Sequence, residues 1–180
     1  MGRVFITPIN IYYLNRKYII ISMEFTDKWN VWYHHTKDNW TLAGYKNIYT
    51  ITNMLDFWKL YNNWDNIGSL TAKHFFLMKN DIKPIWEDTR NRTGGCWSFK
   101  ITDNMANDLW EDLSVLIVCD ELITETEALG LSIVVKKNNT CVVKIWNSDS
   151  NMNSIKYINK TILKKWGTDI IYIAHMAENT

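Results

Sequence analysis

Two stretches rich in β-branched and apolar residues lie close together near the C-terminal end of the chain, and they constrain its fold more than any other feature. They are residues 130–137 and 141–147, and only Asn138-Asn139-Thr140 separates them. Asparagine tolerates the positive φ angles of tight turns, so this junction predicts a β-hairpin. A hairpin pairs its strands antiparallel, and we therefore expect an antiparallel sheet.

Further strands and helices are predicted in separate blocks along the chain. The remaining strands are expected at residues 29–34, 97–101 and 170–175. Apolar residues at helical spacing predict three helices: one over residues 53–64, one from Asp103 that carries Met105, Leu109, Leu113 and Leu116, and one that carries Ile155, Ile158, Ile162 and Trp166 and ends at Gly167. Hairpin strands with helices in separate blocks favour an α+β fold, a single domain with the helices on one face of the sheet.

Length and charge narrow the classes of function. The chain has 180 residues, no low-complexity linker and no internal repeat, so one domain with a well-buried core is expected. Its net charge is +1, so the chain lacks the broad basic field of proteins that bind DNA or RNA through phosphates alone. We expect no DNA partner, and any contact with RNA must be local and chemically specific.

Metal sites, cofactors and catalysis are not indicated. Three cysteines, an odd number and widely spaced, predict free thiols in a reducing cytoplasm, and four histidines have no companion ligands at metal-binding spacing. We find no phosphate-binding loop or nucleophile motif, so we expect no enzyme. The apolar run Tyr18–Ile21 is too short for a signal peptide or a membrane span. The three cysteines are Cys96, Cys119 and Cys141, and the four histidines are His34, His35, His74 and His175.

The first predicted helix carries more apolar surface than a helix with one buried side requires. Phe57, Leu60, Tyr61 and Trp64 form one stripe toward the core, and Met54, Leu55 and Trp58 widen the apolar arc to roughly 220°. Such a helix is either buried on two sides or presents a ridge that binds another protein, for which tryptophan is a favoured anchor.

Trp86 and Glu87 follow a proline turn and stand next to each other in a chain with ten tryptophans. An indole beside a carboxylate can present a flat ring and a hydrogen-bond acceptor to one ligand. Flat rings stack on bases, and a carboxylate accepts hydrogen bonds from the donor edge of guanine. The pair points to a modified nucleotide, specifically the 7-methylguanosine cap of messenger RNA.

An ordered set of aromatic motifs resembles the translation initiation factor 4E family, the proteins that bind mRNA caps. The resemblance runs from about Phe25 to the C-terminus. It implies a curved antiparallel sheet with three helices on its convex face, formed by residues 23–180 after an N-terminal extension of residues 1–22. The motifs are Trp29-x-x-Trp32, Trp40, Asp56-Phe57-Trp58-x-x-Tyr61, Pro84-x-Trp86-Glu87-Asp88, Gly94-Gly95-x-Trp97, Leu109-Trp110 and Ile145-Trp146.

The resemblance assigns roles in cap binding to particular residues. It implies that Trp40 and Trp86 sandwich the methylated base, that Glu87 hydrogen-bonds guanine, and that Trp146 packs against the methyl group. The other indoles of the motifs, Trp29, Trp32, Trp97 and Trp110, are expected in the core.

The residues for the cap phosphates depart from the family pattern. Cys96 stands where the family has an arginine, and Val142 stands where it has a lysine. Lys137 matches another basic position, and Lys144 shares a strand face with Val142 and Trp146 because side chains alternate. Lys137 and Lys144 are therefore the expected phosphate ligands.

The same resemblance implies a second surface that binds a 4G-type scaffold protein, or a 4E-binding repressor, through a Tyr-x-x-x-x-Leu-hydrophobic helix. Phe25, Met54, Trp58 and Val115 occupy the matching positions. Glu111-Asp112 follows Trp110 where the family has a leucine and an acid, which weakens or redirects this contact.

Three functions fit the sequence. The chain is an initiation factor that recruits a scaffold, a cap-binding decoy or repressor that does not, or an interaction module that has lost cap binding. Intact Trp58 favours the first. The high content of Asn, Ile, Lys and Tyr indicates an AT-rich genome, and both a protist parasite and a large DNA virus fit.

Overall fold

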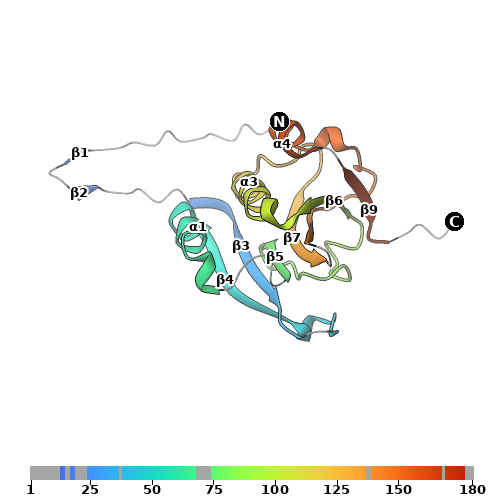
Figure 1. The fold of residues 1–180 in the computed structure, drawn as a ribbon, viewed down its shortest axis with the longest axis horizontal. Helices are drawn as coiled ribbons and strands as arrows, with labels where there is room; N and C mark the ends of the chain where they lie inside the picture. Colours follow the sequence, from blue (N-terminus) through green and yellow to red (C-terminus); the bar gives the residue numbers. More distant parts are fainter. Residues whose placement is uncertain are drawn as a thin grey trace.

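The computed structural model describes residues 13–14, 17–18, 24–36, 38–67, 74–136, 139–167 and 169–176. Within these ranges, seven strands form one curved antiparallel sheet with helices on one face (Figure 1). The strands of this sheet are β3 (Glu24–His34), β4 (Tyr45–Asn53), β5 (His74–Lys79), β6 (Gly95–Thr102), β7 (Ala128–Lys136), β8 (Thr140–Asn147) and β9 (Ile170–Ala174). The helices are α1 (Met54–Tyr61), α2 (Trp64–Ile67), α3 (Ala106–Val118) and α4 (Lys160–Trp166), with short 3-10 turns at Leu42–Gly44, Asp103–Met105 and Ile155–Tyr157.

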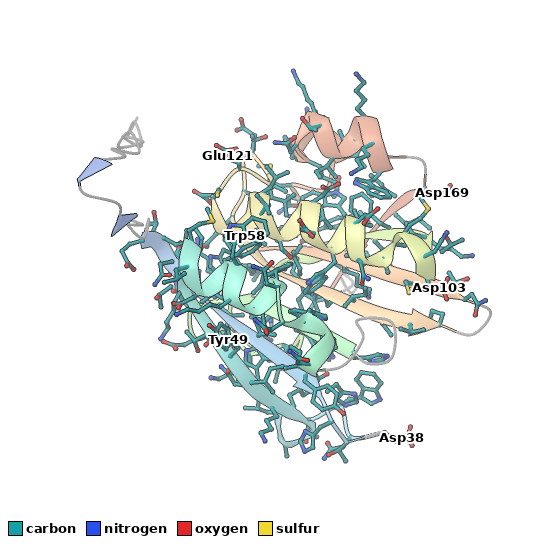
Figure 2. All side chains as sticks on the ribbon, turned by 60° about the vertical axis from the view of Figure 1, so that its left-hand side comes forward. Asp38, Tyr49, Trp58, Asp103, Glu121 and Asp169 are labelled. Atoms are coloured by element: carbon teal, nitrogen blue, oxygen red, sulfur yellow. The ribbon has the colours of Figure 1, made fainter. Side chains whose placement is uncertain are left out.

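This architecture confirms the predicted fold class, a single α+β domain with three longer helices on the convex face of the sheet. The strands lie in the order β4-β3-β5-β7-β8-β6-β9. Figure 2 shows α1, α3 and α4 together on one side of the sheet. In the described residues, the opposite, concave face is formed by strands and by part of the segment after β5, which contributes Ile82.

The sequence patterns did not predict β4 and β5, for two different reasons. β5 is a nearly continuous apolar run, because alternate side chains enter the helix-side core and a second cluster on the concave face. β4 is an edge strand that pairs with β3 on one side, and most of its side chains are partly exposed. Its apolar alternation is therefore weak.

The predicted hairpin is present, and β7 pairs with β8 along their length. Asn139 has a φ of 54°, as the turn chemistry requires. The alternation of side chains places Val142, Lys144 and Trp146 on the concave face, while the residues between them enter the core.

Two hydrophobic clusters lie on the two sides of the sheet. The larger lies under the helices and contains Trp29, Trp97 and Trp110, which confirms their assignment to the core. Trp32 does not belong to it, and that prediction was wrong. It lies three residues after Trp29, so it faces the concave side and packs against the smaller cluster. The smaller cluster consists of Phe76, Met78, Ile82, Cys96, Leu129 and Trp146.

Local hydrogen bonds set the limits of α1. The Asn53 side chain caps its first turn by accepting a hydrogen bond of 2.9 Å from the Asp56 backbone N–H. The helix ends at Tyr61, before the predicted end at Trp64. Asn63 contributes to this stop, because its side chain donates to the Lys59 carbonyl at 2.8 Å.

The third predicted helix is interrupted, so its prediction as one continuous helix was wrong. Ile155 belongs to a short 3-10 turn, and Ile158 forms an isolated β-bridge with Ile123. Asn159 then caps α4 by accepting from the Thr161 backbone N–H at 2.8 Å. The helix ends before Gly167, as predicted.

Most of the predicted N-terminal extension, residues 1–22, lies outside the described residues. Within it, β1 (Tyr13–Leu14) pairs antiparallel with β2 (Lys17–Tyr18), separately from the main sheet. The division into an extension and a domain of residues 23–180 stays a prediction.

Candidate functional site

Two tryptophans are largely exposed on loops that leave the sheet. Trp40 lies between β3 and β4 and is 56% exposed, and Trp86 follows β5 and is 47% exposed. Glu87, next to Trp86, is also exposed. A single exposed indole needs no explanation, but two of them with an adjacent acid are candidates for a ligand site.

The segment after β5 folds back along the concave face toward the Trp40 loop. Ile82 is buried in the concave cluster, and the Lys83 ammonium lies 5.3 Å from the centre of the Trp32 ring. Tyr45, the residue that begins β4 directly after the Trp40 loop, is close to Glu87. Burial raises the pKa of Tyr45 to about 12, and the negative charge of Glu87 contributes. The fold thus brings the charge of Glu87 within electrostatic reach of Tyr45, at the end of the loop that carries Trp40.

Trp40 rests on histidines that the sequence analysis did not assign to the site. The His34 ring stacks on it, with ring centres 4.3 Å apart and planes 17° apart, and the His74 ring lies 5.8 Å away. His34 Nε2 also lies 2.7 Å from the Asn39 carbonyl oxygen. These contacts support one face of the indole and fix its orientation.

Trp146 lies on the concave face in a fixed orientation. It is 7% exposed, and its Nε1–H donates to Ser132 Oγ at 3.0 Å. The ring edge packs near Phe76, with centres 6.4 Å apart, and the His175 ring lies 4.7 Å away. Because the polar edge of the indole is satisfied by Ser132, its remaining surface offers apolar contact.

The Trp86 loop is braced by a buried asparagine. Asn91 is fully buried, and its side-chain amide donates to the carbonyls of Lys83 and Ile85 at 2.9 and 2.7 Å. The Asn91 carbonyl in turn lies 2.7 Å from His175 Nδ1. The loop is therefore linked through His175 to the ring of Trp146.

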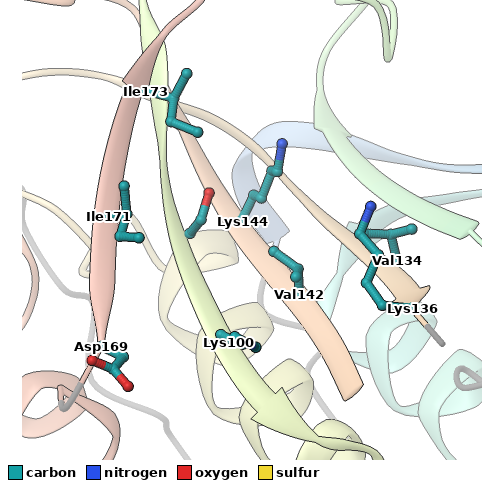
Figure 3. Close-up of a pocket in the computed structure, with 9 residues that line it drawn as sticks. Lys100, Val134, Lys136, Val142, Lys144, Asp169, Ile171 and Ile173 are labelled. Atoms are coloured by element: carbon teal, nitrogen blue, oxygen red, sulfur yellow. The ribbon is translucent and has the colours of Figure 1, made fainter. Parts of the chain in front are cut away.

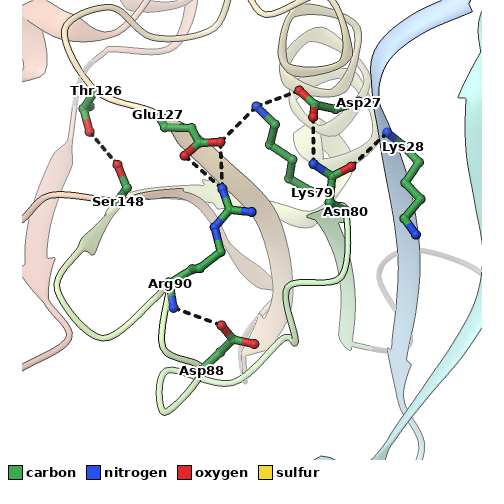
Figure 4. Close-up of polar contacts among 9 residues, drawn as sticks. All are labelled: Asp27, Lys28, Lys79, Asn80, Asp88, Arg90, Thr126, Glu127 and Ser148. Atoms are coloured by element: carbon green, nitrogen blue, oxygen red, sulfur yellow. Dashed lines mark hydrogen bonds and ion pairs between the residues drawn. The ribbon is translucent and has the colours of Figure 1, made fainter.

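A chain of ion pairs anchors the same loop to the sheet (Figure 4). Arg90 pairs with Glu127 at 2.9 Å, and Lys79 bridges Glu127 at 3.1 Å and Asp27 at 2.8 Å. Burial alone would lower the pKa of Lys79, but its hydrogen bonds to the two carboxylates outweigh burial and raise it. The same contacts lower the pKa values of Asp27 and Glu127 despite burial, so all three groups stay charged at neutral pH.

Three lysines lie near this site on the concave face. Lys144 is two residues from Trp146 on the same strand face, as predicted, and Lys100 and Lys136 line the same groove. Lys137 itself lies outside the described residues. Cys96 is buried opposite Trp146, and burial raises the pKa of its thiol.

The predicted docking residues lie on the convex side. Trp58 is 39% exposed on α1 (Figure 2), and Phe25, Met54 and Val115 are each half-buried. Leu55 is 41% exposed on the same helix. The wide apolar arc of α1 is therefore a partly exposed ridge, and the alternative of a helix buried on two sides does not hold.

Other observations limit the chemistry of the described part of the chain. Its three cysteines are free. Its histidines, cysteines and acids form no group of three that could hold a metal ion. None of the helices in the described ranges is long and apolar enough to cross a membrane.

The sequence also matches a known protein family over most of its length. The family model described as "Eukaryotic initiation factor 4E" matches residues 24–178. The chain belongs to this family. Its members are translation initiation factors and not enzymes, in agreement with the sequence prediction.

Individual relatives are distant in sequence but similar in fold. Initiation factor 4E of Candida albicans is 28% identical over 169 residues, which cover 85% of this chain and 79% of that protein. The initiation factor NCBP of Oryza sativa is 29% identical over 107 residues, 59% of this chain and about half (47%) of that protein. Caenorhabditis elegans eIF4E-3, solved with the 4E-binding protein Mextli and a cap analog, superposes with a TM-score of 0.71 at 22% identity, covering 86% of this chain and 93% of that one. Ascaris suum eIF4E-3 with an m2,2,7G cap also gives 0.71, at 21% identity, covering 89% and 95%.

Proposed function

We propose that the concave face binds the 7-methylguanosine cap of mRNA, with the base stacked between Trp40 and Trp86. The exposure of both indoles, together with the electrostatic effect of Glu87 on Tyr45 at the end of the Trp40 loop, carries this proposal. Methylation at N7 gives the base a delocalised positive charge, which indole faces attract. Glu87 then accepts hydrogen bonds from the guanine N1–H and exocyclic amine, a donor pair that adenine lacks.

Trp146 and Lys144 complete the proposed cap site. Trp146 packs against the N7 methyl group, and its bond to Ser132 holds the ring in place. Lys144 lies one step along the same strand face and meets the triphosphate. Lys137 remains a second candidate phosphate ligand. The solved relatives that carry a cap analog or an m2,2,7G cap support this use of the fold.

We propose further that the convex ridge recruits a 4G-type scaffold protein and so starts translation in the cytoplasm. Phe25, Met54, Trp58 and Val115 supply the apolar contacts, with Trp58 as the anchor. The nematode relative solved with a 4E-binding protein supports a partner of this class. A 4E-binding repressor would compete for the same ridge.

A repressor that occupies caps without recruiting a scaffold is the second candidate, and one observation favours it. Glu111 is exposed on α3, one helical turn before Val115, so it adds a negative charge beside the ridge. Asp112 is engaged elsewhere, because it pairs with Lys165 at 2.7 Å. An interaction module without cap binding is the third candidate, and it predicts no affinity for cap analogs.

The base pocket is tested by titrating the protein with m7GTP, GTP and ATP and following tryptophan fluorescence. Trp40→Ala and Trp86→Ala should each lose about 1–3 kcal/mol of binding, the worth of one stacking contact. Glu87→Gln should lose the preference for guanine over adenine. Trp58→Ala is the matched control, since it removes a partly exposed indole from the opposite face. Wild-type affinity in both pocket variants would exclude this pocket.

A further inference from the structure

One face of the exposed Trp40 indole is already occupied. The His34 ring lies nearly parallel to it, with the ring centres 4.3 Å apart and the planes 17° apart. A third ring follows, because His74 stacks on His34 with centres 5.9 Å apart and planes 24° apart. A base that stacks on Trp40 must therefore take the face opposite His34, at the end of a column of three rings.

Strand register builds this column. His34 is the last residue of β3, and it pairs with Tyr45 of β4 on one side and with His74 of β5 on the other. Directly opposed residues of paired strands share a face of the sheet, so these side chains meet beside the Trp40 loop.

The Trp40 loop closes on the column through its own backbone, since His34 Nε2 lies 2.7 Å from the Asn39 carbonyl oxygen. A carbonyl oxygen can only accept a hydrogen bond, so Nε2 carries the proton in this contact. The other ring nitrogen, Nδ1, is then the one that gains a proton when the imidazole becomes charged.

Ionisable groups reach the column from several elements. Burial lowers the pKa of His74, and the positive charges of His34 and of Lys136 on β7 lower it further. Lys136 is one of the lysines of the concave groove (Figure 3). The ring of Tyr45 lies 4.8 Å from that of His34, and burial together with the charge of Glu87 raises the pKa of Tyr45 to about 12, so this phenol stays neutral. The two imidazoles are therefore the groups of the column that change charge near neutral pH.

The charge of the column matters because the proposed ligand is itself a cation. An indole attracts a cation through the electron density of its faces, and a protonated imidazole on one face competes for that attraction. It also puts a second positive charge roughly 8 Å from the methylated base, one stacking distance beyond the 4.3 Å between His34 and Trp40. At this distance, repulsion in a partly solvated site corresponds to a loss of affinity of roughly two- to tenfold.

We propose that His34 is a positioning residue that makes cap binding depend on pH: its neutral ring supports Trp40 for the cationic base, and its protonated ring weakens that stack. His34 acts through Trp40 and does not touch the ligand. The inference rests on the proposed cap site, because only a ligand stacked on Trp40 senses the column.

The test follows binding of the cap dinucleotide m7GpppG, which has no terminal phosphate, by tryptophan fluorescence at pH 7.5 and 5.5. His34→Phe keeps a flat ring behind Trp40 but cannot ionise. The two proteins should bind alike at pH 7.5, and on acidification the wild type should lose roughly two- to tenfold more affinity than His34→Phe. Titration of the ligand and of Glu87 is common to both proteins and cancels in this ratio. His35→Phe is the matched control, because alternation turns the neighbouring histidine to the other face of the sheet, and it should keep the wild-type pH dependence.

A second measurement needs no variant. If protonation of His34 weakens the cap, then by linkage the bound cap opposes that protonation. Followed by NMR, the imidazole signals of His34 should change to the protonated form at a lower pH in the m7GpppG complex than in the free protein.

The outcomes separate this inference from the cap site. The same pH dependence in the wild type and in His34→Phe, or an unchanged titration of His34 in the complex, would overturn the inference and leave the cap site standing. A dependence that persists in His34→Phe and disappears in His74→Phe would overturn it too, because the effect would then belong to His74. If m7GpppG does not bind at pH 7.5, the cap site and the role of His34 are both wrong.

Discussion

At the scale of single residues, the site depends on side chains behind the ones that would touch a ligand. Trp40 is largely exposed, but the His34 ring stacked on it supports one face. Trp146 is held through Ser132, and His175 lies against its ring. An indole fixed in this way loses less conformational freedom on binding, which favours affinity.

Two histidines of this supporting layer make stability depend on pH. Burial lowers the pKa of His74 and of His175, and nearby positive charges add to the effect, Lys144 in the case of His175. As the pH falls, these histidines therefore take up protons near their ordinary pKa of 6.5 in the unfolded chain, and only at a lower pH in the folded chain. Stability should be full above pH 6.5 and fall as the pH drops through the lowered pKa values.

Urea unfolding at pH 7.5 and 5.5 measures this loss. His175→Gln should reduce the difference in unfolding free energy between the two pH values, because it removes one of the groups with a lowered pKa. His35→Gln, a change of an exposed histidine, should keep more of the difference. A larger difference in His175→Gln than in the wild type would contradict the assignment.

At the scale of elements, the long loop between β5 and β6 is the part that needs explanation, because it carries Trp86 without regular structure of its own. Asn91 braces it from within, and Arg90 ties it to Glu127 at the start of β7. The Arg90 pair is exposed and worth little by itself, about 0.2–1 kcal/mol. The buried amide of Asn91 is the stronger constraint.

Asn91→Ala should therefore weaken cap binding. It leaves the carbonyls of Lys83 and Ile85 without their partner, at a cost of about 1–3 kcal/mol for a buried polar group. We expect faster amide hydrogen exchange across residues 80–94 and a lower affinity for m7GTP. Asn151→Ala, an exposed asparagine in another turn, is the control and should change neither. A drop in melting temperature with unchanged affinity would show that Asn91 supports the fold and not the loop.

At the scale of the whole molecule, the sheet separates two surfaces. The aromatic loops and the lysine groove lie on the concave face. The ridge of α1 lies on the convex face, where Figure 2 shows Trp58. The core between them is closely packed, with Trp97 and Trp110 fully buried. A change to an exposed side chain on one face should therefore act additively with a change on the other.

Trp58→Ala is expected to abolish binding of a Tyr-x-x-x-x-Leu-hydrophobic peptide, at a cost of more than about 2 kcal/mol, while retention on a cap resin stays unchanged. Lys59→Ala on the same helix is the control. A wild-type protein that binds caps but no such peptide would favour the repressor. Global unfolding of Trp58→Ala would instead mean that Trp58 is a core residue.

Local patterns were enough to predict much of this protein. The hairpin at Asn139, the amphipathic run of α3 and the stop at Gly167 depend on neighbouring residues, and turn chemistry and periodicity describe such features well. The exposed pair of Trp86 and Glu87 could be singled out because it follows a proline turn. The resemblance to the initiation factor 4E family rests on the order of such motifs.

Tertiary structure decided what depends on residues distant in sequence. β5 has apolar residues on both faces because the loop after it folds back, and no local pattern contains that loop's path. The support of Trp40 by His34 and His74 depends on pairing between β3 and β5. The lysine groove brings together β6, β7 and β8, strands whose neighbours are set by long-range hydrogen bonding. Sequence spacing specifies which face a side chain takes, but only strand pairing specifies what lies beside it.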